Sequence, residues 1–198
     1  MNILDIEYHQ IPLLLALEDV KLLNSELKPY ENAHIVYRVD YPEKYLPCQN
    51  YVLKGQIDII KAIDEYCKNK SYLPRINNLS GVLLITTSQG KFTFTPPIVE
   101  KDNFLNNEYI INDGMHRMYY FMNYTDDPVR MVIVEDAICP YYAYPTTWDK
   151  VRVLLDDFIP EDFVKKVHRI NEYKKLYRDF NTVFQHPVGA PRGKGQMR

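Results

Sequence analysis

The feature that most constrains the fold of this 198-residue chain is the stretch EYIINDGMHRMYYFMNY, residues 108–124. It starts with an apolar run that is typical of a buried strand and ends with apolar residues at helical spacing. The polar sequence Asn-Asp-Gly, residues 112–114, separates the two patterns. The stretch therefore predicts a strand over residues 108–112 that runs directly into a helix over residues 114–123.

This strand-to-helix junction has the residue types of an anion-binding site. The first backbone N–H groups of a helix lack intrahelical partners, and together with the helix dipole they favour a bound anion. Gly114 has no side chain to keep an anion from the backbone, and Arg117 offers a planar fork suited to phosphate oxygens. His116 adds a titratable donor, while Asp113 can cap the helix or face a divalent cation. Together these residues favour a phosphate-binding site over an ordinary capped helix start.

The chain offers no other glycine-based phosphate-binding motif. Neither GxxxxGK[ST] nor GxGxxG occurs in the sequence. Within residues 1–184 the glycines are Gly55, Gly81, Gly90 and Gly114. If the protein holds a phosphate through a glycine-containing backbone, Gly114 is therefore the natural place.

The remaining pattern predicts an α+β fold with one main domain over residues 1–144. Helices are expected over residues 13–27 and about 56–69, where apolar residues recur every three or four positions. Strands are expected over residues 34–39, 82–87, 91–95, 98–99 and 129–136, and a turn at 88–90 joins two of them in a hairpin.

The C-terminal part of the chain has a different pattern. Residues 145–184 are expected to form helices packed on the domain, the first capped by Thr146 or Thr147 and the second starting at Pro160. Residues 185–198 have no apolar period and are predicted to be a disordered basic tail.

The net charge of −2 is unevenly distributed. Residues 160–198 carry nine Lys/Arg and four Asp/Glu, hence +5, while residues 1–159 carry fifteen and twenty-two, hence −7. A basic C-terminal arm on an acidic body could contact nucleic acid or an acidic partner. The alternative, a solvated helix face with a short tail, explains the same charges and is the favoured interpretation.

The cysteines and the N-terminus bear on the compartment. Cys48, Cys67 and Cys139 are odd in number and far apart, and the absence of a CxxC pair argues against a thiolate zinc site. A start without signal-peptide character favours a reducing cytoplasm. The longest early apolar stretch, residues 11–17, is too short to span a bilayer, so no membrane partner is expected.

The stretch PPIVEKDNFLNNEYIINDGMHRMYYFMNY, followed by VRMVIVED, resembles the ParB/sulfiredoxin superfamily. Its members share a proline-led strand, a Gly-x-His-Arg or related motif at a helix start, and a following apolar strand. Residues 113–117, Asp-Gly-Met-His-Arg, are closest to the DGHHR and DGQHR variants of that motif, and the resemblance covers roughly residues 11–136. It implies a small mixed sheet with helices that binds a nucleotide, ATP or ADP, with Mg²⁺.

The resemblance also implies roles for single residues. The nucleotide phosphates would lie on Gly114, Met115, His116 and Arg117, and Asp113 would face the metal ion. Met115 stands where sulfiredoxin has a cysteine, so sulfiredoxin's sulfur chemistry is not expected. The free-serine kinases of the superfamily have a catalytic glutamate, and Glu31 in the sequence KPYE is the matching carboxylate by position.

Two functional hypotheses follow from these residues. The first is an enzyme, a Mg²⁺-dependent phosphotransferase or nucleotide hydrolase acting on a small molecule, with Glu31, Asp113 and His116 as catalytic residues. The second is a non-catalytic nucleotide- or DNA-binding regulatory module that uses the basic C-terminal arm. Residues 145–184 show no helix-turn-helix unit of the kind that ParB partition proteins carry, so nucleic acid is the less favoured partner.

Overall fold

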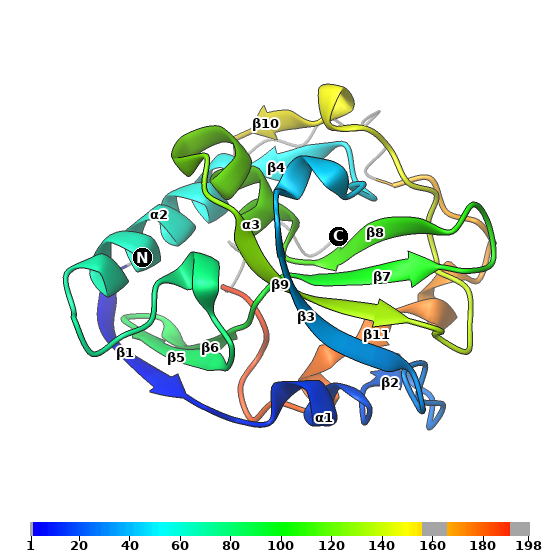
Figure 1. The fold of residues 1–198 in the computed structure, drawn as a ribbon, viewed down its shortest axis with the longest axis horizontal. Helices are drawn as coiled ribbons and strands as arrows, with labels where there is room; N and C mark the ends of the chain where they lie inside the picture. The colour runs from blue at the N-terminus through cyan, green and yellow to red at the C-terminus, as the bar shows by residue number, and fades with distance from the viewer. Residues whose placement is uncertain (1, 156–165, 191–198) are drawn as a thin grey trace.

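The computed structural model describes residues 2–155 and 166–190, and it has a mixed α+β architecture (Figure 1). The α+β expectation is therefore confirmed. The strands are β1 (Ile3–His9), β2 (Lys21–Leu22), β3 (His34–Asp40), β4 (Tyr51–Leu53), β5 (Val82–Thr87), β6 (Gly90–Phe94), β7 (Ile98–Asp102), β8 (Glu108–Asp113), β9 (Val129–Glu135), β10 (Arg152–Leu154) and β11 (Arg178–Asp179). The α-helices are α1 (Leu13–Leu17), α2 (Lys54–Lys68) and α3 (Met115–Tyr120).

The largest sheet has four strands in the order β3-β9-β7-β8. β7 runs parallel to β9, whereas the β3–β9 and β7–β8 pairs are antiparallel, so the sheet is mixed as expected. β9 lies inside the sheet, and its residues from Met131 to Val134 are fully buried. Burial on both faces explains why this strand reads as a continuous apolar run rather than an alternating one.

A second sheet, in the order β1-β5-β6, contains the expected hairpin. Phe92 and Phe94 of β6 alternate with polar residues and point into the core, as a strand that is polar on one face requires. Ile60 and Ile63 of α2 belong to the same core cluster. The helical period of α2 therefore has a clear cause, since one face of the helix packs in this core.

The first helix is shorter than the sequence predicted. α1 ends at Leu17 instead of Leu27, and the chain continues into β2, which pairs with β11 near the C-terminus. Val20, which belongs to the expected helical period, is buried in a non-helical backbone. A strand partner from the far end of the chain overrides the local helical pattern here.

The prediction of C-terminal helices over residues 145–184 is wrong for the described residues of that region, 145–155 and 166–184. A 3-10 turn at Trp148–Lys150 leads into β10, which pairs in parallel with β4. A second 3-10 turn at Tyr173–Leu176 leads into β11. Both strands find partners in distant parts of the chain, which sequence periodicity cannot anticipate. The start of the expected second helix, at Pro160, lies outside the described residues.

The segment expected to be a disordered tail is described as far as Ala190, and this part lies against β6. The backbone N–H of Thr93 donates to Pro187 O at 2.8 Å, and the N–H of Gly189 donates to Thr93 O at 2.9 Å. Residues 191–198 lie outside the described part of the chain. None of the helices in residues 2–155 and 166–190 is long and apolar enough to cross a membrane.

Candidate functional site

A strand runs into a helix at Gly114, as the sequence predicted, but Gly114 itself is the N-cap residue, Asp113 makes no capping hydrogen bond to the described residues, and α3 ends at Tyr120 instead of residue 123. Gly114 lies between Asp113, the last residue of β8, and Met115, the first residue of α3, and its φ of +90° is left-handed. A Cβ at this position would lie 2.8 Å from Arg117 Nε and 3.0 Å from Pro97 Cα. Glycine is therefore required twice, by the backbone conformation and by the lack of space.

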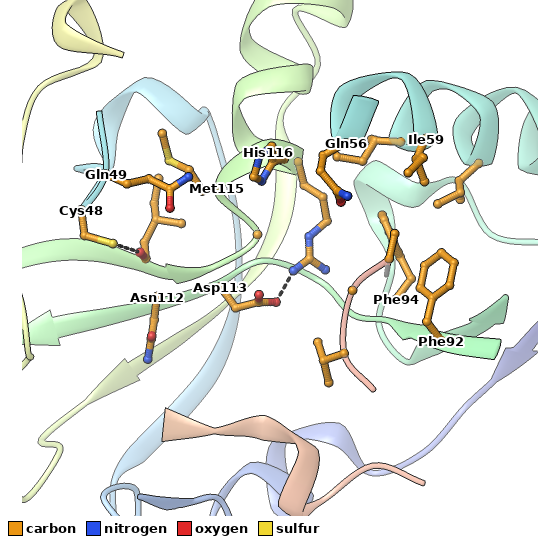
Figure 2. Close-up of a pocket in the computed structure, with 18 of the residues that line it drawn as sticks. Cys48, Gln49, Gln56, Ile59, Phe92, Phe94, Asn112, Asp113, Met115 and His116 are labelled. Carbon is orange, nitrogen blue, oxygen red and sulfur yellow. Dashed lines mark hydrogen bonds and ion pairs between the residues drawn. The ribbon is translucent and has the colours of Figure 1, made fainter. Parts of the chain in front are cut away.

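A cavity of about 200 Å³ adjoins this junction. Figure 2 shows Cys48 and Gln49 on one side of the cavity and Phe92 and Phe94 on the other, with Asp113 and His116 between them. The lining also includes Asn112, Gly114, Met115 and Arg117 from the junction, Gln56, Ile59, Ile60 and Ile63 from α2, Ile111 from β8, and Lys166, Val188, Gly189 and Ala190 from the C-terminal segment.

The Arg117 guanidinium is held by protein acceptors. It donates to the backbone and hydroxyl oxygens of Thr95 and forms an ion pair with Asp113. Its Cζ atom lies 5.0 Å from the centre of the Phe94 ring, and its side chain is 8% exposed. The fork expected to bind phosphate is therefore already occupied, so a ligand phosphate has to share it or displace an acceptor.

Asp113 keeps part of its binding capacity. Its Oδ2 atom accepts the hydrogen bond of Arg117, and no donor among the described residues contacts Oδ1. The described residues contain no cluster of three His, Cys, Asp or Glu side chains that could hold a metal ion. Mg²⁺ commonly uses only one or two carboxylates, because phosphate oxygens and water complete its coordination. A single carboxylate with one open oxygen fits that donor set.

His116 has a structural contact that the sequence did not suggest. Its Nε2 atom accepts the backbone N–H of Leu53 at 3.0 Å, and Leu53 is the N-cap residue of α2. Nε2 therefore carries no proton in this arrangement, and His116 links the start of α3 to the start of α2. The catalytic role expected for His116 stays a prediction.

The structure does not bring Glu31 to the cavity. Glu31 is exposed in a turn before β3 and is not one of the residues that line the cavity. Asp113, Gly114, Met115, His116 and Arg117, by contrast, all line it. The general-base role of Glu31 stays a prediction, and the observed geometry gives it no support.

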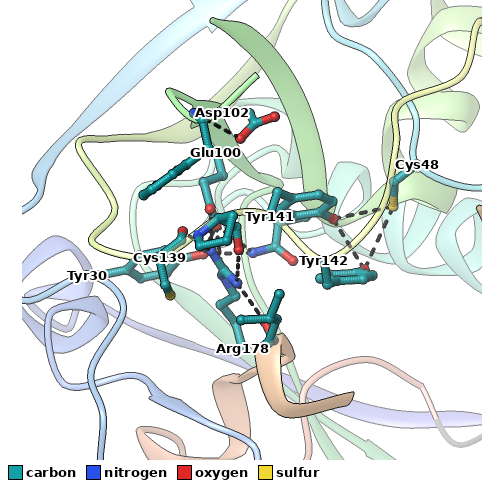
Figure 3. Close-up of polar contacts among 12 residues, drawn as sticks. Tyr30, Cys48, Glu100, Asp102, Cys139, Tyr141, Tyr142 and Arg178 are labelled. Carbon is teal, nitrogen blue, oxygen red and sulfur yellow. Dashed lines mark hydrogen bonds and ion pairs between the residues drawn. The ribbon is translucent and has the colours of Figure 1, made fainter. Parts of the chain in front are cut away.

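Tyr30, the residue before Glu31, belongs to a buried polar network that the sequence analysis missed (Figure 3). Its hydroxyl donates to Glu100 Oε2 at 2.9 Å and accepts a hydrogen bond from Asn112 Nδ2 at 2.7 Å. Because Asn112 lines the cavity, this network fixes part of the cavity wall. Burial, with a contribution from the nearby Glu100 carboxylate, raises the pKa of the Tyr30 phenol well above its ordinary value.

Glu100 is also paired with Arg178 of the C-terminal segment. Arg178 Nη2 lies 2.5 Å from Glu100 Oε1, and Nε donates to Oε2 at 3.0 Å. Burial opposes the charge of Arg178, but the adjacent carboxylate outweighs it, so the pKa of the guanidinium is raised above its ordinary value. The only sequence signal for this pair was an acidic residue inside the otherwise apolar start of β7, because a buried carboxylate needs a partner.

Comparison with protein families gives a match over most of the chain. The family model described as the ParB CE domain matches residues 12–152 of the chain. The matched region contains the junction and most of the cavity wall, and it agrees with the resemblance to the ParB/sulfiredoxin superfamily. Neither the curated proteins nor the solved structures gave a match.

Proposed function

The chain belongs to the ParB CE domain family, and from this premise we propose that it binds a nucleotide in the cavity beside Gly114. The observation that carries the proposal is the junction itself. Residues 113–117 all line the cavity, and they combine a left-handed glycine with a guanidinium and a carboxylate. This combination suits a phosphate group better than a neutral ligand.

The two sides of the cavity support a ligand with two different ends. The junction supplies charged and polar groups, whereas Ile59, Phe92 and Phe94 supply an apolar and aromatic surface. A nucleotide has phosphates at one end and a flat base at the other, so it matches this division.

The Asp113–Arg117 ion pair sets a condition on phosphate binding. A phosphate that takes the Arg117 fork competes with Asp113 for the same donors. Mg²⁺, when bound, would supply positive charge that neutralises the phosphates. Asp113 would hold the ion through its open Oδ1 atom. The ion would weaken the Asp113–Arg117 ion pair, and the Arg117 guanidinium could then bind the phosphate.

Phosphoryl transfer or nucleotide hydrolysis is the second candidate function. It is supported by Asp113, a carboxylate in the cavity wall, and it lacks the base that Glu31 was expected to supply. In phosphoryl transfer, positioning and charge neutralisation provide most of the rate enhancement, so a sparse site is compatible with turnover.

Nucleic-acid binding through the C-terminal arm has weaker support. Arg169 and Arg178 form buried ion pairs with Asp102 and Glu100, respectively. These two cations neutralise carboxylates of the same chain, so they are not available to phosphates of a nucleic acid.

The test compares nucleotide binding by two arginine variants. Calorimetric titration of ATP and ADP, with and without Mg²⁺, is expected to show that Arg117→Ala weakens binding at least tenfold. Arg130→Ala in β9 is the matched control, because Arg130 does not line the cavity, and it is expected to change affinity less than twofold. Equal affinities of the two folded variants would remove Arg117 from the site and refute the proposal. Arg117→Lys, which keeps the charge and loses the fork, serves if Arg117→Ala does not fold.

Turnover is tested separately with the same protein. Release of phosphate from ATP that Asp113→Asn abolishes and Glu31→Gln leaves unchanged would support hydrolysis at the cavity. Tight nucleotide binding without turnover, alone or with candidate acceptors, would support the non-catalytic module.

A further inference from the structure

We propose that Lys166 is a second cation of the cavity and binds an anionic group of the ligand, a carboxylate or a phosphate, at the Cys48 end. The residue lies in the C-terminal segment, outside residues 12–152 that match the family model. The inference deepens the proposed function and rests on it for the choice of cavity. It adds that the ligand has an anionic group beside Lys166 that is separate from the group held by residues 113–117.

The first argument is the charge balance of the cavity wall. Arg117 is neutralised by its ion pair with Asp113. Lys166, in contrast, has no carboxylate of the described residues within 4.0 Å of its Nζ atom. The positive charge at the Cys48 end is therefore uncompensated by the described part of the chain, and a partly enclosed ammonium attracts an anion more strongly than one in bulk water.

The second argument is that neutral groups hold Lys166 in place. Its Nζ atom donates to the Tyr142 hydroxyl at 2.5 Å and lies 4.6 Å from the centre of the Tyr142 ring and 6.0 Å from that of Tyr177. Burial raises the pKa of the Tyr142 phenol well above its ordinary value. The phenol thus stays neutral near pH 7, so it orients the ammonium without cancelling its charge.

The third argument is the connection from Tyr142 to the cavity wall. Tyr141 donates to Cys48 Sγ at 3.3 Å, and the Tyr142 hydroxyl lies 3.8 Å from the same sulfur (Figure 3). Tyr141 and Tyr142 are buried, and their ring centres lie 4.4 Å apart. Cys48 lines the cavity together with Lys166. Tyr142, which is buried and packed on Tyr141, therefore contacts both the Lys166 ammonium and the Cys48 thiol.

The first experiment measures binding of simple anions to the full-length protein. Orthophosphate and succinate are titrated at constant ionic strength, with chloride as the reference salt, and both affinity and melting temperature are recorded. Lys166→Met is expected to weaken at least one of the two anions tenfold or more. Lys175→Met is the matched control, because Lys175 lies in the same segment, is exposed, pairs with Glu172 and does not line the cavity.

The two anions distinguish the ligand chemistries. Preference for orthophosphate points to a phosphate at the Lys166 end, and preference for succinate points to a carboxylate. Equal binding of both anions by Lys166→Met and the parent protein overturns the proposal, as does the absence of anion binding by the parent protein.

A second experiment uses Cys48 as a local reporter. The rates of its alkylation by iodoacetate, which is anionic, and by iodoacetamide, which is neutral, are compared by mass spectrometry of the Cys48 peptide. Lys166→Met is expected to lower the iodoacetate-to-iodoacetamide ratio at Cys48 several-fold, while the ratio at the half-buried Cys139 stays constant. An unchanged ratio at Cys48 contradicts the proposal.

Failure of this inference and failure of the proposed function give different results. If Lys166→Met and the parent protein have the same affinity for nucleotides and the same affinity for simple anions, Lys166 takes no part in binding, and the proposed nucleotide site is unaffected. If no nucleotide binds but anion affinity still depends on Lys166, the cavity takes an anionic ligand of another class.

Discussion

Two arginine–carboxylate pairs of the described residues, Glu100–Arg178 and Asp113–Arg117, differ in their surroundings. In the Glu100–Arg178 pair the side chains are 1% and 0% exposed, and in the Asp113–Arg117 pair they are 29% and 8% exposed. The first is fully buried and joins β11 of the C-terminal segment to β7. The second lies in the wall of the cavity.

The partners of each pair show what the difference means. The nitrogen atoms of Arg178 donate to both oxygens of Glu100 and to the carbonyl oxygens of Cys139, Pro140 and Leu176. A guanidinium with all donors used, facing a fully buried carboxylate, has nothing left to exchange. No described residue donates a hydrogen bond to Asp113 Oδ1, so this carboxylate can accept a further donor or a cation. The same chemistry therefore holds the fold in one place and offers a binding surface in the other.

The largest expected effect is the loss of the buried pair. Glu100→Gln is expected to lower the free energy of unfolding by about 3–5 kcal/mol, because it leaves the Arg178 guanidinium buried without its carboxylate. Asp113→Asn is expected to lower it by about 1.5 kcal/mol, since the carboxylate is partly exposed and Arg117 keeps its bonds to Thr95. Urea unfolding of both variants measures the difference.

A matched control for this comparison lies in the same C-terminal segment. Glu172→Gln breaks an ion pair with Lys175 in which both side chains are about 70% exposed, so no measurable change in stability is expected. Equal losses for Glu100→Gln and Asp113→Asn would show that burial does not separate the two pairs.

The second effect concerns Gly114, which lies between Asp113 and Arg117 in the sequence. Gly114→Ala is expected to destabilise the protein by about 2 kcal/mol through its left-handed backbone and to displace Arg117, because the new Cβ would lie 2.8 Å from Nε. Nucleotide affinity should fall with stability. Chemical unfolding and calorimetric titration of the same variant test both consequences.

Gly189→Ala separates backbone strain from crowding. Gly189 has a φ of +84°, and a Cβ there would meet nothing within 4 Å. Its substitution should lower stability by about 1 kcal/mol, the backbone contribution alone. If the two alanine variants lose the same stability, the contact with Arg117 contributes nothing.

The smallest effect is a pH dependence of the segment that Arg178 anchors. Burial, with a smaller contribution from the Lys166 cation, lowers the pKa of His168 below its ordinary value of 6.5. Folding therefore favours the neutral imidazole, so this contribution to stability is complete above pH 6.5 and is lost as the pH falls through the folded-state pKa.

His168→Phe provides the measurement for this effect. The variant keeps a ring to stack on Tyr173, whose ring centre lies 3.4 Å from that of His168, and removes the titration. Melting temperatures between pH 7 and pH 5 should fall less steeply in the variant than in the parent protein. Parallel curves would show that His168 does not titrate differently in the folded state.

The sequence predicted the parts of the fold whose pattern is local. The period of α2, the hairpin of β5 and β6, and the buried run of β9 all agree with the expected elements. In each of these elements the apolar residues that face the core recur at the period of the helix or strand. The local sequence pattern is therefore enough to identify the element. The same holds for the junction, where neighbouring residues supply both the turn and the polar groups.

The expectations failed where a distant partner decided the local structure. β2, β10 and β11 lie in segments that were expected to be helical, but β2 pairs with β11 and β10 pairs with β4 as short strands. Strand pairing supplies backbone hydrogen bonds from far along the chain, and no window of sequence contains that information.

By itself, the sequence determined the Asp-Gly-Met-His-Arg junction, because a left-handed glycine, its helix and its flanking charges are set by adjacent residues. Only the tertiary structure decided the rest of the site. It left Glu31 outside the cavity, paired Glu100 with Arg178, and brought Lys166 into the cavity wall together with Cys48. The physical reason is that burial and ion pairing decide which charged residues, far apart in sequence, come together. Both exist only after the chain has folded.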